Sequence, residues 1–228
     1  MTDTDKLESV IKSIAAERKQ LNGLIAGMSP YTLPFIACGD RVEVIFYRPE
    51  TDKLVPAAGV QNPKSALDYP VNELKEMLDV NYTGVFVAAR ACASEMYRHK
   101  TKDGSICLIA SMSGSIANKG LITPVYNSSK GAVVQLARSL AMEWGRIRPD
   151  KSGGIRVNSL SPGHIRTPMV NKNFEDGDLS EPDIAERAML GRISEPEEFK
   201  ATGLFLMSKA SSFIVSSSPL CFNALGES

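Results

Sequence analysis

The sequence has few of the features that mark secreted or metal-binding proteins. Its 228 residues include four cysteines and two histidines, with no CxxC spacing and no histidine in metal-ligand register with a cysteine. This pattern favours free thiols in a reducing compartment over disulfides or zinc, so we expect no metal site.

Net charge and long apolar runs are also absent. The 26 basic and 26 acidic residues cancel, which gives no electrostatic reason to expect nucleic acid or an anionic membrane surface as a partner. No apolar run approaches the roughly 20 residues of a membrane span. The polar start MTDTDKLESV is unlike a signal peptide. We therefore expect a cytoplasmic protein whose partner is a small molecule.

Composition and periodicity predict one α/β domain over residues 1–228. With 43% apolar and 23% charged residues, the chain is long enough to bury a sizeable core. Apolar strand-length runs alternate with helix-period segments, and such strands indicate a parallel sheet covered on both faces. Helices are predicted at 5–18, 70–96 and 124–146, and strands at 21–26, 105–110 and 155–163.

Chemically useful residues follow two of the predicted strands, where ligands bind in such sheets. Ser113 lies in the loop after the strand at 105–110. Tyr126 and Lys130 follow at the start of the next helix, four positions apart and therefore on one face. A nearby ammonium stabilises a phenolate, so we expect the pKa of Tyr126 to fall below its usual value near 10. Such a phenol can exchange a proton with a carbonyl or alcohol oxygen.

These residues resemble the short-chain dehydrogenase/reductase family, in which a Tyr-x-x-x-Lys pair follows a serine by thirteen positions, as Tyr126 follows Ser113. Three further family motifs occur in order: Ala58-Gly59 in VPAAGVQ, Asn81 in DVNYTGVF, and Pro162-Gly163-x-x-x-Thr167. The resemblance covers about residues 57–213. The segments MSGSIANKG and RVNSLSPGHIRTPM are similar in sequence to the corresponding segments of fungal ketose and polyol reductases.

The resemblance implies a Rossmann-like doubly wound parallel sheet, a cofactor that is NADP or NAD, and a homodimer or homotetramer. Tyr126 would be the general acid or base, and Ser113 would orient the substrate oxygen. Lys130 would bind the nicotinamide ribose and lower the Tyr126 pKa. Asn81 would bend its helix and hold a water in a proton relay. The implied cofactor-binding residues are Gly59, Asn81, Tyr126, Lys130, Pro162, Gly163, Ile165 and Thr167.

Taken one at a time, the same residues have ordinary structural explanations. Ser113 and Thr167 are of types common in turns and helix caps, and Gly59 suits a turn. A single tyrosine is usually half-buried, and a single lysine is usually solvated. The order and spacing of the whole set favour the functional interpretation. His164 matches no family motif, so it is predicted to be a loop residue.

Three departures from the family pattern accompany the matches. The family's opening Thr-Gly-x-x-x-Gly-x-Gly turn, which binds the cofactor pyrophosphate, occurs nowhere in the sequence. The sheet is therefore expected to be incomplete, without the first strands. Residues 27–56 have no counterpart in the family; they are expected to be an insert, either an irregular loop or, at 41–47, a strand. Residues 214–228 form an atypical tail in place of the last strand.

Two functions follow from these patterns. The first is an oxidoreductase that moves a hydride between NAD(P)H and a ketone or secondary alcohol, sugar-like or polyol-like. It depends on Asn81, Ser113, Tyr126 and Lys130. The alternative is a non-catalytic truncated relative that cannot bind the cofactor tightly, and it depends on the absent glycine-rich turn.

Overall fold

A computed structural model describes residues 52–216 of the chain. Within this range the sheet has three parallel strands in the order β1, β2, β3. They are β1 (Lys53–Leu54), β2 (Ser105–Ile109) and β3 (Arg156–Leu160). Neighbouring strands come in chain order and point the same way, so each connection must cross back along the sheet, as in α/β proteins.

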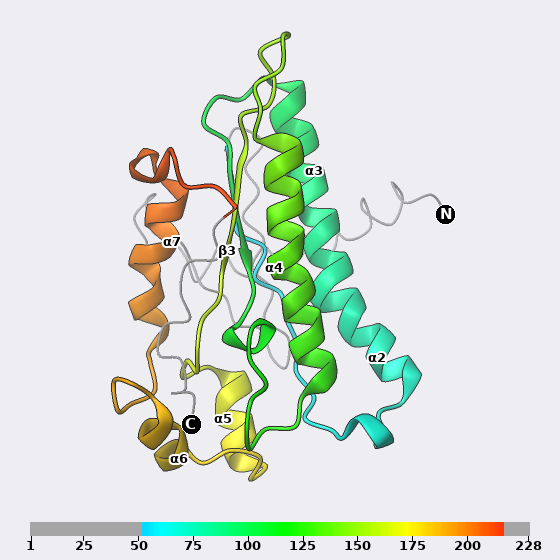
Figure 1. Cartoon of the computed structure of the whole chain (residues 1–228), viewed down its shortest axis with the longest axis vertical. Helices are drawn as coiled ribbons and strands as arrows, with labels where there is room; N and C mark the ends of the chain where they lie inside the picture. The colour runs from blue at the N-terminus through cyan, green and yellow to red at the C-terminus, as the bar shows by residue number, and fades with distance from the viewer. Residues whose placement is uncertain (1–51, 217–228) are drawn as a thin grey trace, which may run out of the picture. The chain divides into compact units, whose positions relative to one another are not determined.

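Helices make these connections and cover both faces of the sheet (Figure 1). A π-helical segment joins α2 to α3 without a loop. Shorter 3₁₀ turns occur at Ala66–Asp68, Met112–Gly114, Pro196–Phe199 and Lys209–Ser211. The longer elements are α2 (Val71–Leu78), the π-helical segment Asp79–Gly84, α3 (Val85–Arg98), α4 (Pro124–Trp144), α5 (Pro168–Glu175), α6 (Glu181–Arg187) and α7 (Lys200–Met207).

The core has two layers because side chains along a strand alternate between the faces of the sheet. From β2, Ile106 and Leu108 pack with residues of α3 and α4 on one face. Cys107 packs with Leu206 and Met207 of α7 on the other face. Figure 1 shows α3 and α4 running along one side of the strands and α7 along the opposite side. The observed fold is thus the Rossmann-like α/β class expected from the sequence.

The strand before the Ala58-Gly59 turn differs from the sequence-based expectation. β1 lies at the end of the range 27–56, and Leu54 pairs with Ile106 of β2. Leu54 is only 1% exposed and belongs to the α3–α4 side of the core. Residues 53–54 are therefore part of the sheet and not part of an insert. The helix predicted at 5–18, the strands predicted at 21–26 and 41–47, and the rest of 27–56 up to residue 51 lie outside the described residues.

Arg156 holds the start of the tail against β3. Its guanidinium is buried and donates hydrogen bonds to the backbone oxygens of Leu206, Ser208 and Ile214. The Ser216 N–H donates to the Val157 oxygen at 2.9 Å, so the tail begins alongside β3. Residues 217–228 lie outside the described range. Between residues 52 and 216 no helix is both long enough and apolar enough to span a membrane.

Candidate functional site

The site is built at the carboxyl ends of β2 and β3, where α4 begins. Pro124 occupies the first turn of α4, a position that needs no backbone N–H. Two positions later Tyr126 lies half-buried, and Lys130 lies one turn further along the helix. The Lys130 ammonium lies over the Tyr126 ring, 5.7 Å from its centroid. The predicted pair therefore shares one face of α4.

Lys130 is buried, with 4% of its surface exposed. Its ammonium donates a hydrogen bond to the Ile109 oxygen at the end of β2, at 3.0 Å. Burial disfavours the charged form and lowers the pKa of Lys130 to about 8. A side chain at Gly59 would lie beside this ammonium, because a Cβ there would be 3.4 Å from Lys130 Nζ and 3.6 Å from Asn81 Oδ1. The glycine leaves that space open.

Asn81 ties three segments together around the lysine. It is fully buried in the π-helical segment between α2 and α3. Its Oδ1 accepts from the Val60 N–H at 2.8 Å, and its Nδ2 donates to the Val60 oxygen at 2.9 Å. Nδ2 also donates to Ser129 Oγ at 3.0 Å, next to Lys130 on α4. The amide therefore fixes both the turn after β1 and the helix that holds Tyr126 and Lys130.

The electrostatics of Tyr126 differ from the sequence-based expectation. Burial raises the pKa of the Tyr126 phenol above its ordinary value, and a hydrogen bond with the Ser111 side chain opposes this by a smaller amount. The expected lowering by Lys130 is not observed. The Lys130 ammonium lies over the ring and donates its hydrogen bond to the Ile109 oxygen. Burial also disfavours the charged form of Lys130.

The turn after β2 presents two serines to this site, and they have different partners. Ser111 caps the turn Met112–Gly114 by accepting from the Ser113 N–H at 3.2 Å, and its side chain slightly lowers the pKa of Tyr126. The hydroxyl of Ser113 instead accepts from Asn118 Nδ2 at 2.7 Å. The thirteen-residue spacing pointed to Ser113, and sequence alone gave no way to rank the two serines by contact with the phenol.

Gly114 allows the serine turn to pack directly on α4. A Cβ at this position would come within 2.8 Å of the Gly131 nitrogen and the Lys130 carbonyl carbon. Such a contact requires backbone movement, so the close approach depends on glycine here. The serines are thereby held beside the start of α4.

The loop after β3 closes another side of the site. The Pro162 oxygen accepts from the Met112 N–H at 2.9 Å, which joins this loop to the serine turn. Ile165 forms a parallel bridge with Ser194. Thr167 caps α5, because its hydroxyl accepts from the Val170 N–H at 3.4 Å. Gly59 and Pro162 therefore lie at the same end of the sheet as the Tyr126–Lys130 pair.

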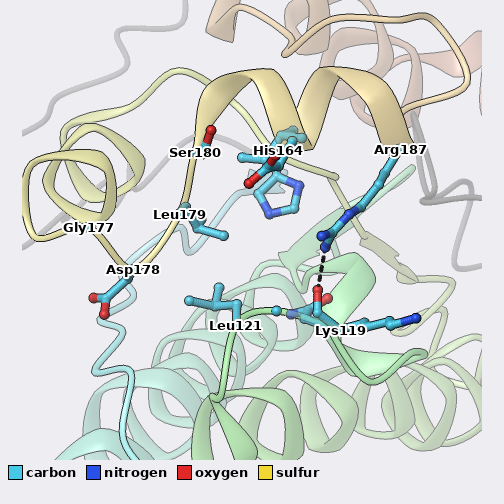
Figure 2. Close-up of a pocket in the computed structure, with 12 residues that line it drawn as sticks. Lys119, Leu121, His164, Gly177, Asp178, Leu179, Ser180 and Arg187 are labelled. Carbon is cyan, nitrogen blue, oxygen red and sulfur yellow. Dashed lines mark hydrogen bonds between the residues drawn. The ribbon is translucent and has the colours of Figure 1, made fainter.

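A pocket of about 360 Å³ lies next to the loops that follow β2 and β3 (Figure 2), and Tyr126, Lys130, Ser111, Ser113 and Asn81 are not among the residues that line it. One wall is the loop at residues 118–121, and the other is α6 with the residues before it. Figure 2 shows Arg187 of α6 reaching the Lys119 backbone oxygen, to which its Nη1 donates at 2.7 Å. His164 lies in the loop after β3, as predicted from the sequence, and it also lines the pocket. The remaining lining residues are Asn118, Gly120, Leu121, Gly177, Asp178, Leu179, Ser180, Asp183 and Ile184.

The burial of Lys130 predicts a pH-dependent stability. Its pKa is about 8 in the folded chain and 10.5 for an unperturbed lysine. Between these values the unfolded chain binds more protons, so the free energy of unfolding should rise as the pH increases from about 8 to 10.5. We expect a gain on the order of 3 kcal/mol for wild type relative to Lys130→Met, measured by urea unfolding across this range. Parallel pH curves for the two proteins would contradict the burial of a charged lysine.

The comparisons with known proteins identify the family. The sequence model of the family described as "Enoyl-(Acyl carrier protein) reductase" matches residues 40–218. A protein of Aspergillus versicolor named "Short chain dehydrogenases/reductase notP'" is 43% identical over 162 residues. The chain thus belongs to the short-chain dehydrogenase/reductase family. The match to the family begins inside the range 27–56, in agreement with the position of β1.

Two further relatives have named substrates or ligands. "Galactitol 2-dehydrogenase (L-tagatose-forming)" of Cereibacter sphaeroides is 38% identical over 162 residues, which are 71% of this chain and 60% of that protein. A solved gluconate 5-dehydrogenase of Burkholderia cenocepacia, in complex with NADP and tartrate, is similar with a TM-score of 0.68 and 27% identity, over 76% of this chain and 64% of that one. The Aspergillus match covers 71% of this chain and 54% of the relative. The chain therefore spans little more than half the length of the curated relatives it matches.

Proposed function

We propose that this chain carries the catalytic half of an NAD(P)-dependent oxidoreductase that interconverts a ketone and a secondary alcohol of the sugar or polyol class. The main support is the cluster of Tyr126, Lys130, Ser111 and Asn81 at the carboxyl end of the sheet. Relatives named as polyol dehydrogenases support the substrate class.

In the direction of reduction, Tyr126 gives its hydroxyl proton to the carbonyl oxygen while the carbonyl carbon receives a hydride. Ser111 would hold the same oxygen, because its side chain is near enough to the phenol to lower the Tyr126 pKa slightly. The ammonium of Lys130 lies over the ring of the phenolate that remains, 5.7 Å from its centroid. Asn81 acts by holding Lys130 and the turn at Gly59 in place. In the direction of oxidation the phenolate takes the proton back.

The nicotinamide half of a dinucleotide cofactor fits the residues present. The open space at Gly59 lies beside a buried ammonium that can donate to ribose hydroxyls. The loop Pro162–Thr167 adjoins the serine turn and would hold the nicotinamide through Gly163, Ile165 and Thr167. When bound, the reduced nicotinamide supplies the hydride. We propose NADP or NAD; the sequence resemblance favours NADP, whereas a fungal relative is named as an NADH-dependent L-xylulose reductase.

Replacing each of the two serines should affect the rate differently. Ser113 was the sequence-based candidate for orienting the substrate oxygen, whereas the effect of Ser111 on the Tyr126 pKa favours Ser111. We expect Ser111→Ala to lower kcat about a hundredfold, because it removes a donor to the developing oxyanion. Ser113→Ala should cost less, since its hydroxyl is already bonded to Asn118. Initial rates of NADPH consumption with a ketose compare the two variants, and the reverse order would return the role to Ser113.

The proposal also covers the partner and the assembly of the protein. The partner is a small-molecule carbonyl or alcohol. We propose that the chain forms a homodimer or homotetramer through α3 and α4. A stable monomer in sedimentation at micromolar concentration would contradict the assembly. The cytoplasmic location remains a prediction from the sequence. The alternative, a non-catalytic relative, is favoured only by the missing glycine-rich turn and predicts no turnover even when cofactor binding is restored.

A further inference from the structure

One buried side chain of α5 joins this helix to a segment far away in the sequence. Asn173 is 5% exposed, and its Nδ2 donates to Gln61 Oε1 at 2.8 Å, although the two residues are 112 positions apart. Gln61 lies two residues after Gly59, in the turn that follows β1. Since β1 and β3 are not neighbours in the sheet, this hydrogen bond connects segments that follow two separated strands.

The backbone of Asn173 also holds part of the pocket wall. Its oxygen accepts from the Asp178 N–H at 2.9 Å and from the Leu179 N–H at 3.1 Å. Asp178 and Leu179 both line the pocket (Figure 2). The position of this part of the wall therefore depends on where Asn173 lies.

On the other side, the hydrogen bond leads back to the helix that carries the catalytic pair. Val60, the residue before Gln61, exchanges two hydrogen bonds with the side chain of Asn81. Asn81 in turn donates to Ser129 Oγ, next to Lys130 on α4. A continuous series of hydrogen-bonded residues thus runs from α4, through the turn after β1, to the wall of the pocket.

The burial of Asn173 makes its hydrogen bond more important than an exposed contact of the same segment. Arg166 forms an ion pair with Glu181 of α6, but these side chains are 37% and 42% exposed. Exposed ion pairs usually contribute little to stability. Removing the partner of a buried amide costs more, because the amide is left without a hydrogen bond away from water. The Gln61–Asn173 bond is therefore expected to fix the position of α5.

We propose that Asn173 is a positioning residue, which holds the pocket wall at residues 178–179 in place relative to the turn after β1 through its hydrogen bond to Gln61. Without this bond the wall shifts and substrate binding weakens, while the catalytic pair on α4 stays in place and the chemical step keeps its rate. This inference rests on the proposed function, because it takes the pocket to hold the rest of the ketone or polyol.

Hydrogen exchange on the full chain tests this connection without requiring turnover. Gln61→Leu removes the acceptor, so exchange of the Asp178 and Leu179 N–H groups should become about tenfold faster. Asn173→Leu should have the same effect there and should also speed exchange of the Val60 N–H, on the far side of the bond. Gln61→Glu keeps an acceptor oxygen and should exchange like wild type. Exchange in β2 should not change, which distinguishes a lost connection from general destabilisation.

Steady-state kinetics then separate positioning from catalysis. At saturating NADPH, Gln61→Leu and Asn173→Leu should each raise the KM for a ketose about tenfold and leave kcat within about twofold, because a shifted wall weakens ground-state and transition-state binding equally. The double variant should be no worse than either single variant, since both remove the same bond. Asn171→Leu, at an exposed position of α5, is the matched control and should change neither constant.

The outcomes separate this inference from the proposed function. Wild-type exchange at residues 178–179 in Gln61→Leu would overturn the inference, and so would faster exchange throughout β2. This measurement does not depend on whether Asn173→Leu folds. Faster exchange with an unchanged KM, or a lower kcat with an unchanged KM, would also overturn the role in substrate binding. Faster exchange confined to the expected positions, together with no hydride transfer by wild type, would support the connection and reject the proposed reaction.

Discussion

Placing a strand, a glycine-rich turn and a helix of the family before this polypeptide should tighten NADPH binding by a factor of hundreds to thousands. The sequence contains no Thr-Gly-x-x-x-Gly-x-Gly motif, the turn whose backbone amides bind the pyrophosphate in the family. Preorganised donors at a helix N-terminus favour phosphate strongly. If they contribute on the order of 3 to 5 kcal/mol, affinity changes by about tenfold for each 1.4 kcal/mol.

Nicotinamide fluorescence titration of the two polypeptides measures this difference. A third polypeptide, in which valines replace the glycines of the added turn, controls for the extra chain length and should bind as weakly as the original. Residues 27–39 can be removed in the same series, but the family match begins at residue 40 and Leu54 pairs with β2, so the chain from residue 40 onward must stay. Micromolar binding by the original polypeptide would show that other residues hold the phosphates.

Replacing Tyr126 by phenylalanine should lower kcat by about 10²- to 10⁴-fold in the polypeptide that binds cofactor. The variant keeps the ring beneath the Lys130 ammonium and removes only the hydroxyl, so the fold and the cofactor contacts should persist. Loss of a positioned proton donor usually costs this much. Steady-state NADPH consumption with a ketose measures the change.

Tyr82→Phe is the matched control for that experiment. Tyr82 packs against the core beside α3 and has no assigned part in the reaction, so its rate should stay within about twofold of wild type. If Tyr126→Phe retained the wild-type rate, the phenol would not be the proton donor. Loss of NADPH binding in that variant would instead show that the hydroxyl holds the cofactor.

The fold was largely predictable because its determinants are local. The apolar run at 105–110 and the helix pattern at 124–146 correspond closely to β2 and α4. The strand before the Ala58-Gly59 turn was misplaced, since the short segment at Lys53–Leu54 carries little periodicity and its assignment depends on pairing with β2. A two-residue strand gives almost no pattern to detect in a single sequence.

The site was predictable in outline but not in its contacts. Spacing placed Tyr126 and Lys130 on one helix face, because i and i+4 geometry is fixed by the helix itself. The choice between Ser111 and Ser113 depends on the path of a 3₁₀ turn, which spacing does not specify. The buried position of Asn118, and an oxygen without a partner among the described residues, could not be expected from the sequence, because both are tertiary properties. The direction of the Tyr126 pKa shift was wrong because sequence gives no measure of desolvation.

Deuterium transfer tests the central claim most directly. NADPH deuterated at the transferable position of the nicotinamide is incubated with a ketose and the polypeptide that carries the restored glycine-rich turn, and the product alcohol is analysed by mass spectrometry. The account predicts that wild type places one deuterium on the carbinol carbon, and that Tyr126→Phe forms little or no labelled alcohol. An unlabelled alcohol product, or equal labelling by wild type and Tyr126→Phe, would contradict the assignment of this site to hydride transfer.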